Sequence, residues 1–195
     1  MPRINATSIE EHVRVQTARI LDAAGQLFRE KGYRCTDMDD IASAVGLARN
    51  SLYRYYGNKD FILLACVARD MEAYLAEMKS MGDLYTDTAD RIGAWLDLQI
   101  DFATSPAHAT LEFMAEIRSD APRLQQQVMK LHDAPATVLN TAVAESLRGK
   151  RRDAGLVAAL VRGLVEVAAG QAQLRVDKSL VKRELHRAVT CLLGN

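Results

Sequence analysis

This 195-residue chain has little of what a disulfide framework or a metal site needs. Its three cysteines, Cys35, Cys66 and Cys191, are far apart and in no metal-ligand spacing. An odd number of isolated cysteines predicts reduced thiols in a cytosolic protein. The four histidines are scattered and pair with no ligand-spaced cysteine or carboxylate, so we expect no metal ion.

Charge of either sign is not in excess. The 25 basic residues equal the 25 acidic residues, which argues against bulk electrostatic adhesion to nucleic acid or membrane. Any anion-binding surface must therefore be local. The N-terminus has no apolar stretch of signal-peptide length, and no segment nears the length of a membrane span. We expect a cytoplasmic protein with no membrane partner.

Enzyme signatures are also missing. The chain contains no Walker loop, no Rossmann glycine fingerprint, no nucleophile elbow and no HExxH pair. Catalysis has no support in the sequence, so we expect neither an enzyme nor a cofactor.

Helical periodicity is what the sequence does have. Apolar residues recur at helical spacing almost everywhere, and no convincing run alternates like a strand. The pattern predicts an all-α fold with helices over about 8–31, from Thr36 to Val45, over about 49–56 and over about 59–79. Thr36 is the expected N-cap of the second helix, and Gly32 and Gly46 are expected to end the first two helices.

Three short helices with a glycine-containing turn between the second and third form a helix-turn-helix pattern. The stretch "GLARNSLYRYYGNKD", Gly46 to Asp60, contains no acid before Asp60. On a helical wheel Leu52 and Tyr56 face the first helix, whereas Asn50, Ser51 and Arg54 point away from it. A solvated helix face would give the same pattern.

The C-terminal two thirds continue as helices. We expect breaks at Ser105-Pro106, an end before Pro122, a kink at Pro135 in a helix over about 124–147, and a solvated loop at "RGKRRD". The last two helices are apolar around much of their circumference, which favours a helix-pair interface with a second subunit over a purely internal core. The predicted interface residues are Leu160, Leu164, Leu185 and Val189.

At the N-terminus, "ILDAAGQLFREKGY" followed by "TDMDDIASAVGLARNSLYRYYGNKDFIL" resembles the DNA-binding domain of TetR-family transcriptional regulators. The match covers Ile20 to about Leu63, and beyond residue 80 only the helical layout is similar. Two positions depart from the family pattern. Ala48 replaces the small hydroxyl residue that often caps the recognition helix, and Asp39 stands where many members carry a basic or polar residue.

The resemblance implies contacts with DNA, and the chemistry agrees, because arginine and asparagine read base edges while tyrosine, serine and lysine hold phosphates. The DNA-binding residues that it implies are Thr36, Arg49, Asn50, Ser51, Tyr53, Tyr55 and Lys59.

We interpret the chain as a homodimeric repressor that binds a palindromic operator and releases it on binding a small hydrophobic effector. The expected domains are a helix-turn-helix domain (1–57), a connecting helix (58–80) and a larger helical ligand-binding and dimerisation domain (81–195). The side chains expected to line the effector site are Trp95, Phe102, Leu111, Met114 and Met129. A ligand-independent or activating regulator, and an all-helical interaction module or enzyme, are the alternatives.

Overall fold

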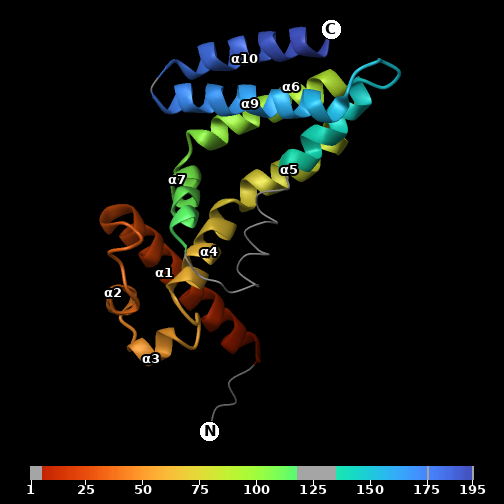
Figure 1. Ribbon diagram of the computed structural model, residues 1–195. Helices are drawn as coiled ribbons and strands as arrows, with labels where there is room; N and C mark the ends of the chain where they lie inside the picture. Colours follow the sequence, from red (N-terminus) through yellow and green to blue (C-terminus); the bar gives the residue numbers. More distant parts are fainter. Residues whose placement is uncertain (1–5, 118–134, 175, 195) are drawn as a thin grey trace. The chain divides into compact units, whose positions relative to one another are not determined.

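The protein is all-α, as the sequence predicts. The computed structural model describes residues 6–117, 135–174 and 176–194, and no strand occurs among them (Figure 1). The chain divides into two compact units, the first formed by Met1–Asp70 with Ala109–Val128 and the second by Met71–His108 with Met129–Asn195. The units are therefore not continuous in sequence, in contrast to the three consecutive segments expected. One of the boundaries between them, after His108, lies within the helix Pro106–Glu112, because residues 109–116 belong to the first unit.

The first unit consists of the helix-turn-helix region, the helix that follows it and a short 3-10 helix that comes back from later in the chain. Its elements are α1 (Ala6–Lys31), α2 (Met38–Val45), α3 (Arg49–Leu52), α4 (Lys59–Asp70) and η1 (Phe113–Glu116). Helix α1 packs against α2 and α4, α3 packs against α2, and η1 packs against α4.

A continuous apolar core fixes these helices. Ile20 and Phe28 of α1, Ile41 of α2, Leu52 of α3 and Ile62 of α4 have no exposed surface. Burying side chains of this size stabilises the fold by about 1.5–3 kcal/mol each. Leu52 faces the core as the helical wheel predicts, and this burial orients the rest of α3 outward.

The caps of α2 differ in part from the expectation. Asp37, not Thr36, is the N-cap, and its carboxylate accepts hydrogen bonds from the backbone N–H groups of Asp39 and Asp40. Asp40 in turn accepts a hydrogen bond from the Asp37 N–H, which completes a capping box. At the other end Gly46 adopts the left-handed conformation with φ 69°, as a helix-ending glycine should.

Two predicted helices have different ends in the structure. Helix α3 stops at Leu52, and the chain continues through turn residues to Tyr55, whose N–H donates to Leu52 O at 2.9 Å. The long helix expected from about Lys59 to Lys79 is interrupted at Met71 and continues as α5 (Glu72–Leu84). The sequence has neither glycine nor proline at this break, so its composition gives no sign of it.

The second unit is a packed group of helices. Its elements are α5, α6 (Thr88–Ala103), the first residues of α7 (Pro106–Glu112), a helix over residues 135–146, α9 (Ala154–Gln173) and α10 (Lys178–Leu193). Helix α6 packs against α5, α9 and α10, and α9 packs against α10. The break at Ser105-Pro106 and the loop at "RGKRRD" are where the sequence places them. Residues 118–134, including Pro122 and the first part of the helix expected over 124–147, lie outside the described residues.

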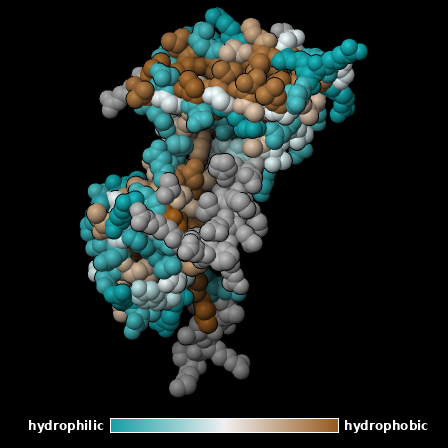
Figure 2. Space-filling view, viewed as in Figure 1, coloured by the Kyte–Doolittle hydropathy of each residue, from teal (hydrophilic) through white to brown (hydrophobic). Residues whose placement is uncertain are grey.

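Helices α9 and α10 carry an exposed apolar stripe. On α9 it comprises Leu156 (60% exposed), Leu160 (48%), Leu164 (37%) and Val167 (67%), and Leu180 of α10 is 41% exposed. Hydrophobic side chains gather over these two helices in Figure 2. A shallow apolar groove on this face is lined by Ala159, Leu160, Gly163, Leu164, Val167, Ala188, Cys191 and Leu192.

Two of the four predicted interface residues do not belong to this surface. Leu185 and Val189 are 4% and 2% exposed, because they lie on the face of α10 that packs into the second unit. Their assignment to a dimer interface is wrong in this structure, whereas Leu160 and Leu164 remain on the exposed face.

The expectation that no segment nears a membrane span is wrong for α9 by length and composition. Ala154–Gln173 is long and apolar enough to cross a bilayer, and 22% of its apolar window is buried in the structure. A helix that packs against two others and offers its remaining face to a further helix is equally long and apolar, so length and composition do not distinguish it from a membrane span.

Candidate nucleic-acid interface

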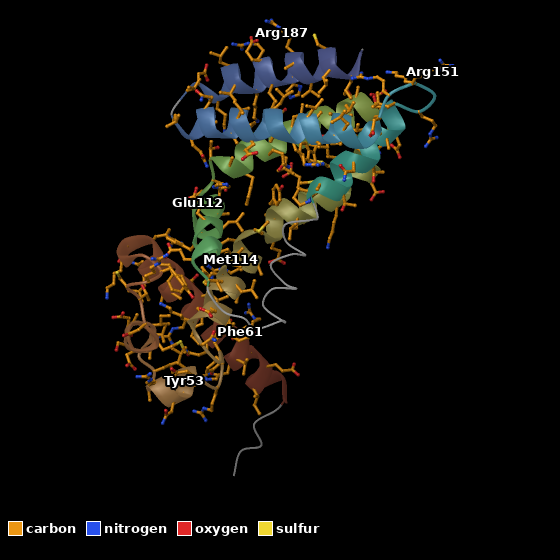
Figure 3. The ribbon with its side chains drawn as sticks, in the orientation of Figure 1. Tyr53, Phe61, Glu112, Met114, Arg151 and Arg187 are labelled. Carbon is orange, nitrogen blue, oxygen red and sulfur yellow. The ribbon has the colours of Figure 1, made fainter. Side chains whose placement is uncertain are left out.

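Helix α3 presents a polar and cationic surface outward. Arg49, Asn50 and Tyr53 are exposed, and Ser51 and Tyr55 are half-buried. Figure 3 shows Tyr53 at α3, at the outer edge of the first unit. Five of the seven side chains expected to meet DNA are thus brought together on one short helix and the turn that follows it, and only Thr36 and Lys59 lie elsewhere.

The turn between α2 and α3 is supported by the backbone rather than by a side-chain cap. The Leu47 N–H donates to Ala42 O at 2.9 Å, so the chain reverses directly after Gly46. Ala48 precedes α3 and makes no side-chain capping bond, in agreement with its departure from the family pattern. The first N–H groups of α3 therefore receive no side-chain oxygen from Ala48.

Arg49 is held by two neighbours. Its Nη1 donates to the Asp39 carboxylate at 2.6 Å, and its Nη2 donates to the Tyr53 hydroxyl at 3.3 Å. Its guanidinium carbon also lies 5.7 Å from the centre of the Tyr53 ring. The hydrogen bond to Tyr53 and the charge of Asp39 raise the pKa of Arg49 above its ordinary value. Asp39 is a functional candidate that the family comparison marked only as an unusual acid, because no local pattern joins residues ten positions apart.

Lys59 is anchored to the turn between α1 and α2. Its ammonium donates to Tyr33 O at 2.9 Å and to Thr36 O at 3.0 Å, and it lies 4.4 Å from the centre of the Tyr33 ring. The neighbouring Asp60 carboxylate accepts a hydrogen bond from the Tyr33 hydroxyl. Burial and this acid together raise the pKa of Tyr33. Two of the three ammonium protons are thus used inside the protein, and one remains for a phosphate.

Thr36 is not available to DNA. Its side chain has no exposed surface, and its hydroxyl donates to Gly32 O at 2.9 Å. The predicted phosphate contact is therefore wrong for this side chain, since its oxygen faces the end of α1. Its backbone carbonyl instead accepts a hydrogen bond from the Lys59 ammonium.

The described residues among those predicted to line an effector site are divided between the two units. Trp95 is 3% exposed, and its indole N–H donates to Pro135 O at 3.1 Å, as a buried core tryptophan does. Phe102 is half-buried in the second unit, whereas Leu111 and Met114 are half-buried and belong to the first unit. Met129 lies outside the described residues.

A different cluster surrounds Phe102. The ring of Phe102 stacks on Tyr74 with centroids 4.2 Å apart and meets His108 edge-on at 5.7 Å. The Tyr74 hydroxyl donates to Gln99 Oε1 at 3.0 Å, and burial raises the pKa of Tyr74 to about 12. Gln173 Nε2 lies 3.3 Å from His108 Nδ1. Sequence reasoning missed Tyr74, Gln99 and Gln173, because polar residues at helical spacing carry no signal of where they converge.

One polar atom of this cluster has no partner. Gln99 Nε2 is buried and makes no hydrogen bond. Turning the amide over exchanges the oxygen and the nitrogen but still leaves one of the two unpaired. A buried amide atom without a partner costs about 1–3 kcal/mol, so it marks a place where a ligand atom would be stabilising.

Comparison with known proteins agrees with the helix-turn-helix geometry. Residues 20–66 match the family described as "Bacterial regulatory proteins, tetR family". The chain is 26% identical over 155 residues to the HTH-type transcriptional repressor Rv1474c of Mycobacterium tuberculosis, covering 71% of this chain and 80% of the relative. It is 20% identical over 147 residues to the fatty acid metabolism regulator protein of Bacillus subtilis, covering 75% and 76%.

A solved structure shares the fold over most of the chain. The transcriptional regulator FadR of Bacillus subtilis, in complex with stearoyl-CoA, superposes with a TM-score of 0.69 at 17% identity, covering 88% of this chain and 96% of that one. The fold and the outward surface of α3 define a DNA-binding transcriptional regulator of the helix-turn-helix class. Residues 20–66 carry the DNA-binding domain of the TetR family, and the relatives named above are transcriptional regulators rather than enzymes.

Proposed function

We propose that this protein is a cytoplasmic repressor that binds a palindromic operator as a homodimer and releases it on binding an amphiphilic small molecule. The observation that carries the proposal is the exposed set Arg49, Asn50 and Tyr53 on a helix anchored by the buried Leu52. Such a set can enter a major groove, where arginine forks to guanine and asparagine to adenine.

The exposed apolar stripe of α9 and α10 supports the homodimer. Leu156, Leu160, Leu164 and Val167 follow one another at helical spacing and remain 37–67% exposed. Gly163 and Ala159 in the adjoining groove permit close approach of another helix. Two copies related by a twofold axis would bury both stripes in a four-helix arrangement and present two α3 helices to one operator. Because net charge is zero, each copy alone offers few phosphate contacts, so pairing strengthens binding.

The cluster around Tyr74 and Phe102 supports the effector. The stacked rings provide an apolar surface, and the unpaired Gln99 amide provides a buried hydrogen-bonding group beside them. A ligand with an apolar body and a carbonyl would satisfy both. The name of the Bacillus subtilis relative and the stearoyl-CoA in the similar structure favour acyl compounds within that class.

The segment after His108 supports coupling between effector and DNA. Residues 109–116 follow the cluster directly in the chain and belong to the first unit. Thr110 Oγ1 donates to the Asp70 carboxylate of α4 at 3.2 Å, and Arg34 Nε donates to the Glu116 carboxylate at 3.0 Å. A ligand that shifts this segment would act on α4 and on the turn before α2, and it would favour the state with lower operator affinity.

The test begins with selection of duplexes from a random pool, followed by fluorescence anisotropy on the selected operator. We expect two half-sites about 34 Å apart, and we expect stearoyl-CoA to weaken binding while coenzyme A alone does not. Gln99→Leu should keep operator affinity and reduce the response to stearoyl-CoA, whereas the exposed Gln171→Ala should change neither. Failure to select any sequence would contradict DNA binding. An unchanged response in Gln99→Leu would remove Gln99 from the effector site.

A further inference from the structure

An acid on α2 holds the first residue of α3. Asp39 Oδ2 lies 2.6 Å from Arg49 Nη1, and the two side chains are 55% and 56% exposed. Both therefore lie on the surface that carries Asn50 and Tyr53. A carboxylate at this position is unexpected for a surface that approaches a polyanion, because it repels phosphates and neutralises one of the few cations present.

The three acids at the start of α2 have different tasks. The Asp37 carboxylate caps the helix. The Asp40 carboxylate accepts a hydrogen bond from the Asp37 N–H and pairs with Lys31 at 3.1 Å. Asp39 takes no part in the capping box, and its carboxylate bonds to Arg49. Asp39 still lies in the first turn of α2, where an acid is favourable, but capping does not account for its bond to Arg49.

The pairing restricts the Arg49 side chain but leaves some of its N–H donors available. Asp39 and the Tyr53 hydroxyl occupy two of its five N–H donors and hold the guanidinium from two sides. The remaining donors stay available. The guanidinium of Arg49 then approaches DNA with its plane already oriented, and a bidentate contact with the O6 and N7 atoms of guanine needs such an orientation.

Asp39 also makes base edges and phosphates unequal partners for Arg49. A phosphate carries a negative charge, so it must either displace Asp39 or lie beside it against electrostatic repulsion. The acceptors of guanine are neutral, so they can share the guanidinium with Asp39. The same carboxylate thus weakens the contact that any sequence can make and leaves the contact that only a particular base can make.

We propose that Asp39 is a positioning residue that determines the specificity of DNA binding by reserving Arg49 for a base edge. The inference rests on the proposed operator binding. It assigns to Asp39 an effect on the ratio of operator to random-DNA affinity, rather than on operator affinity alone.

The experiment measures binding of the full-length protein to two duplexes of equal length, the selected operator and a random sequence, at several salt concentrations. Asp39→Ala should strengthen random-DNA binding about fivefold at 0.1 M salt and steepen its salt dependence by about one unit per half-site, because Arg49 becomes free to hold a phosphate. Operator affinity should stay within about threefold of the wild-type value, so the specificity ratio falls. Asp39→Asn, which keeps an oxygen acceptor but not the charge, should also strengthen random-DNA binding.

Two controls separate this role from a general change in charge. Glu30→Ala removes an exposed acid from α1 of the same unit, where it pairs with Gln26 rather than with α3, and should leave the ratio unchanged. In an Arg49→Ala background, Asp39→Ala should no longer steepen the salt dependence. An unchanged ratio in Asp39→Ala, or a gain that persists without Arg49, would overturn the inference. Failure of the wild-type protein to select any operator would instead contradict the proposed function.

Discussion

Lys59 shows how a single side chain can have a different task from the one its position in a motif implies. The family resemblance makes it a phosphate contact, but in the structure its ammonium bonds to the carbonyls of Tyr33 and Thr36. These bonds join the first residue of α4 to the turn before α2. This turn determines where α2 begins. Lys59 therefore contributes to the placement of the helix-turn-helix as well as to any contact with DNA.

We therefore expect Lys59→Met, which keeps the apolar stem and removes the three donors, to lower the free energy of unfolding by about 1–2 kcal/mol, since two charge-assisted hydrogen bonds are lost at a half-buried site. Chemical denaturation followed by circular dichroism measures this change. The exposed Lys79→Met of α5 is the matched control and should be neutral. Unchanged stability in Lys59→Met would contradict the anchoring role. A salt dependence of DNA binding equal to that of the wild type would show that Lys59 holds no phosphate.

At the scale of elements, α7 and η1 join parts of the chain that are distant in sequence. Helix α7 begins in the second unit, and η1 packs on α4 in the first. Figure 3 labels Glu112 and Met114 on this segment, beyond the helix start at Pro106. The ion pair between Arg34 and Glu116 ties η1 to the turn after α1, with the two side chains 67% and 31% exposed.

Because exposed pairs contribute little to stability, Glu116→Gln should change the free energy of unfolding by less than about 1 kcal/mol. If the segment couples effector to operator, this variant should still bind the operator but need several-fold more stearoyl-CoA for release. Anisotropy titrations measure both quantities. Glu77→Gln, an exposed position on α5, should behave as wild type. The charge-swapped pair Arg34→Glu with Glu116→Arg should restore the response, and a release curve that coincides with wild type in Glu116→Gln would exclude this contact from the coupling.

For the whole molecule, the apolar stripe on α9 and α10 decides how many copies act together. Leu164 lies on the exposed stripe, whereas Leu185, one of the predicted interface residues, is in the core. The two leucines therefore separate association from folding, although both occupy apolar helical positions in the sequence.

Leu164→Glu should yield a folded monomer, because a charge at the interface of two copies would be buried without a partner. Leu185→Glu should instead unfold the second unit, since the same charge would lie in its core. Sedimentation velocity at micromolar concentration, combined with circular dichroism, distinguishes the two results. Arg183→Glu, at an exposed position of α10 on the side away from the groove, should remain a dimer. A wild-type monomer under these conditions would contradict the homodimer.

The all-α fold and the helix-turn-helix of this protein follow from its sequence alone. Helical periodicity, the helix-ending Gly46 and the apolar Leu52 specify α2, the turn and the outward side of α3, because these features depend on neighbours within one or two turns. What only the tertiary structure decided involves partners distant in the chain. The sequence predicted Thr36 as the cap of α2, but the Thr36 hydroxyl bonds to the end of α1 and Asp37 caps the helix instead.

The same limit explains the dimer and site residues. A helix such as α10 can carry two apolar stripes, and periodicity does not tell which one faces its own chain, so Leu185 and Val189 could be assigned only once α6 and α9 were in place. Likewise the contacts of the site join residues that are 10 to 26 positions apart. They are those of Lys59 with Tyr33 and Thr36 and that of Asp39 with Arg49. Such contacts depend on how helices pack, and packing is a property of the assembled core rather than of any segment in it.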